Sequence, residues 1–325
     1  MPTIIGNALN SNNKKVLDKM HKMDFEFIRR QVITQIRDGA EFIELSAGSL
    51  LHNEIPLLKR SISIIESCGG KALVRSESIE TLREAIKISK NELVIGDIEY
   101  NTAKIDAILE LARHKNVKLI ARTTASGKEK ENGGNSPEKS LLIAQLYIDY
   151  LLDNGMRRSD ILLDPIVRPL EEDFYNGKNF LTTLELFKLD FPQVKTIANL
   201  SNLSEGLPMR SLISSNFVSL VIEKGLDYIV LDVLEKSIIE SIITTLSIIG
   251  KDRNMQSYLS FCRSNREAKK RSMQNGGPYY KKTLIQDYNV TIESRGLIDK
   301  KYHTIVGGSK LPGKQKKINL REDEG

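Results

Sequence analysis

Eight short apolar runs recur along the chain, each three or four residues long and separated from the next by enough residues for a helix. The runs are Thr3–Gly6, Phe42–Leu45, Ala72–Val74, Leu93–Ile95, Lys118–Ala121, Ile161–Leu163, Thr196–Ala198 and Tyr228–Leu231. They are rich in Ile, Val and Leu and do not alternate with polar residues, which is typical of parallel strands covered by helices on their outer face. The chain therefore favours an α/β fold.

The segments between the runs carry the spacing of amphipathic helices. The segment Asp24–Asp38 places Phe25, Ile28 and Val32 on one face, together with Ile33 and Ile36. The same spacing predicts helices over Ser78–Ser89, Thr102–His114, Pro137–Leu152 and Glu235–Ile249. Ser78 and Ser136 suit the N-cap position of their helices, whereas no Ser, Thr or Asn directly precedes Glu235.

Eight strand–helix repeats over about 250 residues predict a closed (β/α)8 TIM barrel. An open doubly wound sheet is the alternative, but it usually carries a glycine fingerprint after its first strand, and the GNALN of residues 6–10 is not GxGxxG.

Charge divides the chain into two parts. The net charge is +6, but residues 263–325 hold 15 Lys/Arg and 7 Asp/Glu and carry +8, so the remainder is near −2. We therefore expect a barrel over residues 1–262 and a basic C-terminal extension over 263–325. Apolar residues such as Tyr279, Tyr280 and Ile305 predict that part of this extension is ordered. Its charge leaves nucleic-acid binding weakly open for the extension and argues against it for the barrel.

Several classes of protein are disfavoured by what the sequence lacks. Apolar runs stay short of the roughly 20 residues of a membrane-spanning helix, and the first residues do not resemble a secretory signal. Two distant cysteines, Cys68 and Cys262, fit a reducing compartment, so a cytoplasmic location is expected. The four histidines are scattered and no P-loop is present, so neither a protein-held metal nor a P-loop nucleotide site is expected.

Polar residues gather at the ends of the predicted strands, where a barrel of this kind places its active site. They include Asn7, Asn10, Glu44, Ser46, Arg75, Glu77, Asp97, Glu99, Arg122, Thr123, Asp164, residues 199–202 and Asp232. The polar, glycine-containing segment Ala125–Lys139 follows the fifth strand and is either a lid over the barrel mouth or a tolerated insertion.

Four blocks resemble the pterin-binding barrel family. The segment SNLSEGLPMRSLISSNF, which starts at Ser201, is similar to the pattern GLSNxSxGLPxRxxxNxxF of methyltetrahydrofolate:corrinoid methyltransferases and of the folate module of cobalamin-dependent methionine synthase. GNALN at Gly6–Asn10 is similar to that group's GERIN, DGAEFIELSAG at Asp38–Gly48 to its GGAxxLDLNxG, and ILLDPIVRPL at Ile161–Leu170 to its YIDPLxxPL. The blocks span roughly residues 3–250 in the same order.

The resemblance implies a site for a reduced pterin, of the methyltetrahydrofolate or tetrahydromethanopterin type, whose N5-methyl group is exchanged with the cobalt of a corrinoid held by a partner protein. By resemblance, Asn202 acts at N5 as the catalytic residue, Asp164 accepts from the pterin N–H groups, and Arg210 steadies the ligand or its tail. Further binding residues are expected among the strand-end side chains Asn10, Ser46, Asp97, Asn199 and Asp232. A homodimer is expected on the same ground.

The chain departs from the family pattern on strands three and four. Arg75 stands where an Asp is usual, and Gly96 followed by Asp97 stands where an Asn is usual. GERIN has become GNALN, and Ser46 and Ser214 stand where Asn is common. An arginine cannot accept a hydrogen bond from a pterin amino group. Arg75 is therefore expected to pair with Asp97 or Glu77 and fill the pocket, or to bind an anionic ligand.

Three functions remain open at this stage. The first is methyl transfer between a reduced pterin and a corrinoid protein. The second is a non-catalytic or repurposed barrel that acts as a subunit of a corrinoid methyl-transfer complex, because the pterin contacts of strands three and four are replaced. The third is dihydropteroate synthase on the same fold, which is disfavoured because its basic anion-binding blocks and its glycine-rich seventh loop are not seen.

Overall fold

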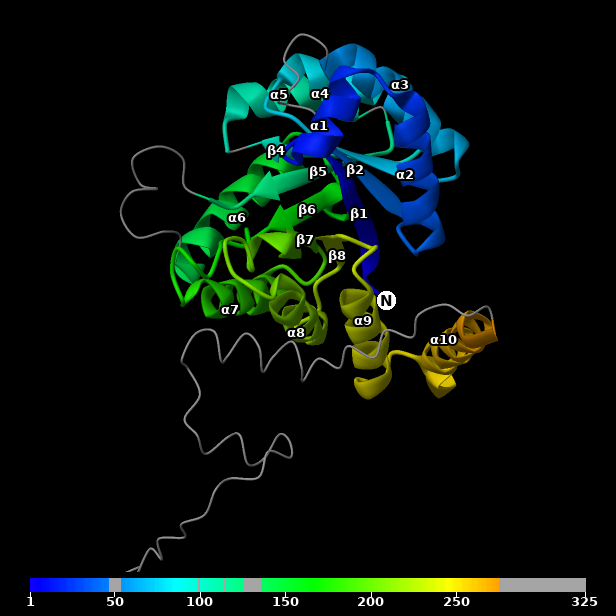
Figure 1. The fold of residues 1–325 in the computed structure, drawn as a ribbon. Helices are drawn as coiled ribbons and strands as arrows, with labels where there is room; N and C mark the ends of the chain where they lie inside the picture. Colours follow the sequence, from blue (N-terminus) through cyan, green and yellow to red (C-terminus); the bar gives the residue numbers. More distant parts are fainter. Residues whose placement is uncertain (47–53, 99, 114, 125–135, 275–325) are drawn as a thin grey trace, which may run out of the picture. The chain divides into compact units, whose positions relative to one another are not determined.

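Eight parallel strands close into a barrel in the computed structural model of the chain (Figure 1), which describes residues 1–46, 54–98, 100–113, 115–124 and 136–274. The strands are β1 (Thr3–Asn10), β2 (Phe42–Ser46), β3 (Lys71–Arg75), β4 (Leu93–Ile98), β5 (Val117–Arg122), β6 (Ile161–Asp164), β7 (Lys195–Asn199) and β8 (Tyr228–Leu231). Each strand pairs with the next, and β8 closes the ring by pairing with β1 through Ile229 and Ile4. The predicted TIM barrel is confirmed.

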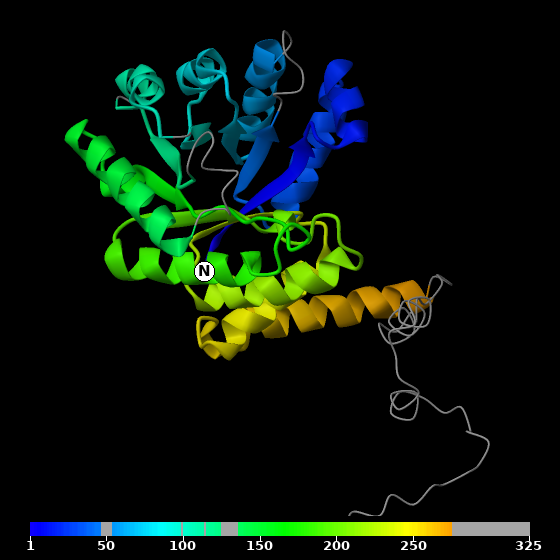
Figure 2. The same cartoon turned by 90° about the vertical axis from the view of Figure 1, so that its left-hand side faces the viewer.

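Helices connect the strands and flank them on the outside (Figure 2). They are α1 (Lys14–His21), α2 (Phe25–Arg37), α3 (Glu54–Ser67), α4 (Ile79–Ile88), α5 (Thr102–Ala112), α6 (Pro137–Asp153), α7 (Asn176–Asp190), α8 (Arg210–Glu223) and α9 (Lys236–Ile248). Both predicted N-caps are confirmed, because Ser78 accepts from the N–H of Thr81 and Ser136 from that of Lys139. Glu235 precedes α9 without a side-chain cap.

Most strands are longer than their apolar runs. β1 continues four residues beyond Gly6 to Asn10, where Leu9 pairs with Leu45 and Asn10 with Ser46. β3 and β5 likewise end on Arg75 and Arg122. Hydrogen bonding to a neighbouring strand holds these polar residues in the ladder, although their own composition does not favour a buried strand. The ladder therefore brings polar side chains into the barrel wall.

Two layers of side chains fill the barrel interior. The first layer is an apolar cluster formed by Ile5, Phe42, Leu73, Val94, Ile120, Leu162, Ile197 and Val230, one from each strand. Because side chains alternate along a strand, the residue two positions later faces the same way. That second layer includes Glu44, Arg75, Arg122, Asp164 and Asn199, which line one cavity, and Gly96, which has no side chain. Asn7 follows the bulge of β1 and Asp232 lies beyond the end of β8, and both line a different cavity. The apolar cluster therefore lies beneath a layer of mostly polar residues at the carboxyl ends of the strands, which we call the polar layer.

Strand β1 contains a bulge shortly before its carboxyl end. The register shifts between Gly6 and Leu9, and the side-chain oxygen of the buried Gln35 on α2 accepts from the Ala8 N–H at 3.0 Å. An extra residue at a bulge leaves a backbone group outside the ladder, and Gln35 satisfies it. Gly6 has no side chain here because a Cβ would overlap Gln35 Oε1.

The chain divides into two compact units, Met1–Leu259 and Ser260–Gly325. The barrel belongs to the first unit. In the second unit, the described residues are those of helix α10 (Gln256–Gln274) from Ser260 onward. Most of the predicted basic extension and most of the predicted lid segment Ala125–Lys139 lie outside the described residues. Across the parts of the chain that are described, no helix combines the length and apolar character needed to span a membrane.

Candidate functional site

A cavity of about 300 Å³ opens at the carboxyl ends of the strands. It is lined by Asn10, Asn12, Glu44, Ser46, Arg75, Arg122, Asp164, Ile166, Val167, Asn199 and Asn202. Six of the nine residues chosen from the sequence as site candidates therefore meet in one place: Asn10, Ser46, Arg75, Asp164, Asn199 and Asn202. We call this space the inner cavity. Its volume is at the lower end of the range of about 300–1,000 Å³ seen for small-molecule sites.

Asp164 at the end of β6 is held in a fixed orientation. Its Oδ1 accepts from the Ile166 N–H at 2.9 Å, and its backbone oxygen accepts from both the N–H and the hydroxyl of Thr123. Ile166 adopts a φ of +55°, which is a strained conformation for a β-branched residue. Such strain costs about 1–3 kcal/mol and persists where the surroundings enforce it. The loop after β6 therefore fixes the carboxylate at the cavity wall.

Asn202 reaches the same cavity from the short 3-10 turn η4 (Leu200–Asn202) that follows β7. Its amide nitrogen donates to the backbone oxygen of Val167 at 3.4 Å, and Asn199 caps the turn by accepting from the Ser201 N–H at 3.1 Å. The amide group is thus tied to the loop after β6, which also orients Asp164. In this arrangement the amide oxygen is the end of the side chain that can accept a hydrogen bond from a ligand.

Arg75 pairs with a carboxylate that the sequence analysis did not consider as its partner. Its Nε lies 3.0 Å from Glu44 Oε1, and its Nη1 lies 4.0 Å from Asp164 Oδ2. The side chains of Arg75 and Glu44 are only 11% and 2% exposed. Glu77 is exposed and the side chain of Asp97 lies outside the described residues, so the expected pairing of Arg75 with one of these two carboxylates stays a prediction.

The strand register explains the Glu44–Arg75 pair. In the ladder Glu44 is opposite Leu73 and Ser46 is opposite Arg75, so Glu44 and Arg75 are diagonal neighbours in the polar layer. A buried ion pair is held against a large desolvation cost only when both partners are present. Arg75 is therefore a fixed part of the wall beside Asp164.

The inner cavity carries balanced charge. Among the described residues, its lining includes two carboxylates, Glu44 and Asp164, and two guanidinium groups, Arg75 and Arg122, whose formal charges cancel. Carboxylates only accept hydrogen bonds when ionised, and guanidinium groups only donate. Together with the amides of Asn10, Asn199 and Asn202, the cavity can therefore meet both donors and acceptors on a neutral, flat polar ligand.

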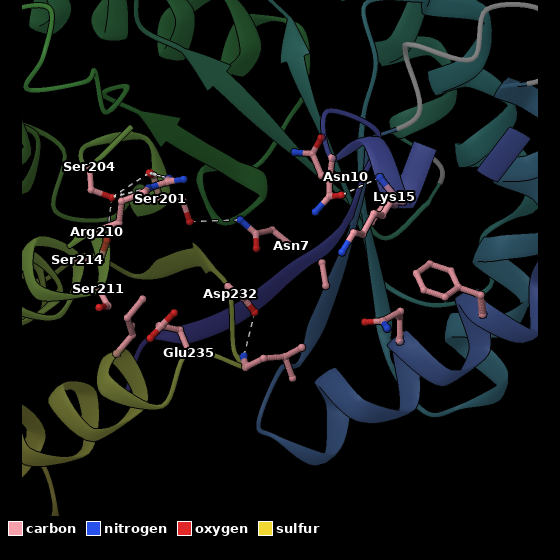
Figure 3. Close-up of a pocket in the computed structure, with 17 residues that line it drawn as sticks. Asn7, Asn10, Lys15, Ser201, Ser204, Arg210, Ser211, Ser214, Asp232 and Glu235 are labelled. Atoms are coloured by element: carbon pink, nitrogen blue, oxygen red, sulfur yellow. Dashed lines mark hydrogen bonds between the residues drawn. The ribbon is translucent and has the colours of Figure 1, made fainter. Parts of the chain in front are cut away.

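A second and larger cavity, of about 540 Å³, shares Asn10 with the inner cavity (Figure 3). Arg210 and Asp232 line this outer cavity rather than the inner one. Arg210 donates to the backbone oxygen of Ser201 at 2.8 Å and to the Ser204 hydroxyl at 3.3 Å. Arg210 thus braces the loop that presents Asn202, and Figure 3 shows it directed at that loop, as Asn7 is from the other side.

Gly96 holds the position in the polar layer where the family pattern has an amide. A Cβ at Gly96 would lie 2.7 Å from Ile120 Cδ1 and 3.2 Å from Ile120 Cβ. Real carbon contacts are optimal at about 3.5–4.0 Å. Ile120, in the apolar layer of the neighbouring strand, therefore occupies the space that a side chain on residue 96 would need.

Sequence reasoning placed Glu44 and Arg122 at strand ends but did not select them as site residues. It missed Asn12 and the pair Ile166–Val167 altogether. Glu44 and Arg122 could have been selected from the sequence, because each lies two residues after an apolar residue that faces the barrel interior, Phe42 or Ile120. The others depend on the paths of the loops after β1 and β6, which have no such period.

A parallel eight-stranded barrel with a polar cavity at the carboxyl ends of its strands is the framework of enzymes that bind small ligands at that end. The family model of the pterin binding enzymes matches residues 6–232, well over half of the chain. The chain belongs to the pterin binding enzyme family.

Similar proteins agree with this assignment. The chain is 26% identical over 260 residues to a methylcorrinoid:tetrahydrofolate methyltransferase of Eubacterium limosum, covering 78% of this chain and 94% of that protein. It is 24% identical over 238 residues to the methionine synthase of Mycobacterium leprae, covering 69% of this chain and 19% of that protein.

Solved structures of dihydropteroate synthases share the fold. The enzyme of Anaplasma phagocytophilum with bound 6-hydroxymethylpterin-monophosphate has a TM-score of 0.55 at 17% identity, covering 75% of this chain and 99% of that one. The Yersinia pestis enzyme with a sulfonamide drug complex has a TM-score of 0.58 at 12% identity, covering 77% and 94%. At these identities the likeness shows the barrel alone.

Proposed function

We propose that this chain is a methyltransferase that moves the N5-methyl group of a reduced pterin to or from the cobalt of a corrinoid on a partner protein. The observation that carries the proposal is that Asp164 and Asn202 line one cavity at the carboxyl end of the barrel. Either tetrahydrofolate or tetrahydromethanopterin fits this proposal, and the homodimer expected from resemblance stays part of it.

Asp164 is proposed to bind the pyrimidine half of the pterin. That ring offers an amino group and a ring N–H, both donors, to a carboxylate whose orientation is fixed by Ile166. Hydrogen bonds to an ionised group contribute about 1.5–3 kcal/mol each. Because Asp164 is only 6% exposed, water competes weakly for these bonds. Asp164 thereby sets the position of the far end of the bicyclic ring.

Asn202 is proposed to act at N5. For the methyl group to leave, the amine must gain positive character, and a protonated N5 is the better leaving group. In this proposal N5 takes its proton from water, and the orientation of the Asn202 amide, with its nitrogen on Val167, lets the amide oxygen accept a hydrogen bond from the protonated N5. The carbon–nitrogen bond then breaks with its electron pair staying on nitrogen. Cobalt(I) supplies both electrons of the new bond to carbon.

The relatives support the same chemistry. The Eubacterium limosum protein is a methylcorrinoid:tetrahydrofolate methyltransferase by name, and the match extends over nearly all of its length. The corrinoid is therefore a second substrate in this proposal, which approaches the cavity mouth on another protein. The strand-end groups Asn10, Ser46 and Asn199, which surround the inner cavity, are proposed to complete the pterin site.

The runner-up is a barrel without its own catalysis that serves as a subunit of a corrinoid methyl-transfer complex. One observation favours it, namely that the Arg75 guanidinium lies 4.0 Å from the Asp164 carboxylate and competes with a pterin for it. Against it stands the Glu44–Arg75 pair at 3.0 Å, which holds the guanidinium at the wall next to Glu44.

Methyl transfer to reduced cobalamin, followed by absorbance, tests the proposal. We expect saturable turnover with N5-methyl-tetrahydrofolate or its methanopterin counterpart. Asn202→Ala should slow transfer by about 100-fold or more with little change in pterin affinity. The matched control is Asn216→Ala, an exposed amide on α8 whose side chain bonds the backbone of its own helix. No binding of either pterin at millimolar concentration would favour the runner-up, and an unaltered rate for Asn202→Ala would remove that residue from the mechanism.

A further inference from the structure

We infer that Arg210 is a positioning residue for methyl transfer, because it fixes the turn that presents Asn202 and thereby sets how Asn202 meets N5. The inference rests on the proposed function, in which Asn202 acts at N5. It gives Arg210 a task that differs from contact with the ligand, which is the task that the family resemblance implies.

Arg210 closes the loop between β7 and α8 with two hydrogen bonds from one guanidinium. Its Nη2 donates to the backbone oxygen of Ser201 at 2.8 Å, and its Nε donates to the Ser204 hydroxyl at 3.3 Å. Ser201 directly precedes Asn202 in the turn η4, and Arg210 is the first residue of α8. The guanidinium therefore ties the turn to the helix that follows it. A planar group that donates from two nitrogens restricts orientation as well as distance.

The other attachments of this loop are weaker. The side-chain nitrogen of Asn202 lies 3.4 Å from the backbone oxygen of Val167, which is longer than the usual N–H···O distance of about 2.7–3.2 Å. The loop also contains two residues with positive φ, Gly206 at +74° and Met209 at +52°, and no side chain caps the start of α8. A strained residue such as Met209 keeps its conformation only where the surroundings enforce it. The position of Asn202 therefore depends on the two bonds from Arg210.

The groups that accept from Arg210 are themselves anchored to the barrel. The Ser204 hydroxyl lies 3.2 Å from the hydroxyl of Ser214 on α8, and both residues are buried. Asn7 of β1 approaches Ser201 from the opposite side and donates to its hydroxyl at 3.4 Å, as Figure 3 shows. Arg210 thus connects two fixed points, and its removal leaves the turn free to shift relative to α8.

A small shift of the turn is enough to slow the reaction. A displacement of about 1 Å at a catalytic group can cost about 100-fold in rate. Loss of Arg210 leaves the bonds to Val167 and within the turn in place, so we expect a smaller effect, of about tenfold. The affinity for the pterin should change little, because the group proposed to hold the pyrimidine half lies on β6.

The experiment measures kcat for methyl transfer to reduced cobalamin and the dissociation constant of the methyl donor. The donor is N5-methyl-tetrahydrofolate or its methanopterin counterpart, whichever wild type turns over. Arg210→Met keeps the length of the side chain without a donor and should lower kcat about tenfold, with the dissociation constant within about threefold of wild type. Arg210→Lys keeps one donor and should lose only about threefold in kcat.

Two further proteins test whether Arg210 acts through Asn202. In the Asn202→Ala background, Arg210→Met should lower kcat by less than about twofold, because the residue that it positions is absent. Arg83→Met is the matched control, since Arg83 pairs with Glu110 at the surface, and its kcat and dissociation constant should equal those of wild type. Urea unfolding establishes that each variant is folded in the assay, and Arg210→Lys keeps the test open if Arg210→Met does not fold.

A second methyl donor separates positioning from contact with the ligand. With a tetrahydropterin that is methylated at N5 but lacks the side chain at C6, Arg210→Met should again lower kcat about tenfold. A loss confined to the dissociation constant, and seen only for the donor that carries the side chain, would show that Arg210 contacts the ligand instead.

The outcomes distinguish this inference from the proposed function. If wild type turns over but Arg210→Met costs the same in the presence and absence of Asn202, Arg210 does not act through Asn202 and only the inference fails. If folded wild-type protein neither binds nor demethylates any of these donors, the proposed function fails and the inference fails with it.

Discussion

Replacing Gly6 by alanine should destabilise the barrel, although alanine normally suits a strand better than glycine. A Cβ on residue 6 would overlap Gln35 Oε1 and would lie 3.0 Å from Gln35 Cδ and 3.3 Å from Ala40 Cβ. Gln35 is fully buried, and its oxygen accepts from the Ala8 N–H at the β1 bulge. The added methyl group therefore displaces the amide that satisfies this backbone group.

The sizes of the competing effects decide whether Gly6→Ala raises or lowers the free energy of unfolding. Overpacking of a well-packed site costs about 1–3 kcal/mol, and a hydrogen bond lost from a half-buried N–H costs about 1 kcal/mol. Replacing glycine gains about 0.5–1 kcal/mol, because the unfolded chain has less freedom to lose. We expect Gly6→Ala to lower the free energy of unfolding by about 2 kcal/mol.

A double-mutant cycle with Gln35→Ala tests the cause. In the Gln35→Ala background the two closest contacts are gone and only Ala40 Cβ, at 3.3 Å, stays near, so Gly6→Ala should be close to neutral. Urea unfolding followed by far-UV circular dichroism gives the four free energies. An equal cost of Gly6→Ala in both backgrounds would refute the reasoning, since it would show that Gln35 does not require the glycine.

Two other variants test the polar layer and the opposite end of the barrel. Gly96→Asn restores the amide of the family pattern but should lower the free energy of unfolding by about 2 kcal/mol, because its Cβ would lie 2.7 Å from Ile120 Cδ1. Ile120→Val removes that atom, so adding it should recover part of the lost stability, as measured by urea unfolding. Burial raises the pKa of Asp227, but its ion pair with Lys188, the Thr196 N–H and Lys195 together outweigh burial and hold that pKa below its ordinary value. The carboxylate therefore stabilises the fold fully above the unfolded pKa of about 3.9 and loses this effect as the pH falls below it. Asp227→Asn should accordingly be less stable than wild type in urea at about pH 6, with the difference shrinking at about pH 3, and a pH-independent difference would contradict the assignment.

Much of the architecture can be predicted from the sequence because it depends on local pattern. The apolar runs locate the strands, and the amphipathic spacing locates α2, α4, α5, α6 and α9 to within two residues at their ends. The placement of Asp164 and Asn202 in one cavity also follows, since strand ends of a parallel barrel face the same way. Their roles at a pterin stay predictions.

Other features depend on relations between strands that no single segment shows. The pairing of Arg75 with Glu44 follows from the register of β2 against β3, which is set by the closed ladder. The glycine at residue 96 is explained by Ile120 on the neighbouring strand. Arg210 was expected to steady the ligand or its tail. The path of the loop after β7 places it against Ser201 and at the outer cavity, and its role at a ligand stays a prediction.

Calorimetric titration of a reduced pterin into wild type and Asp164→Asn tests the central claim most directly. The asparagine has nearly the same shape and can still accept from the Ile166 N–H, so the loop after β6 should keep its structure. Losing the charge from the acceptor should weaken binding by about 10- to 100-fold. Saturable binding by wild type with this loss would support a pterin site anchored by Asp164, whereas equal affinities in the two proteins would contradict it.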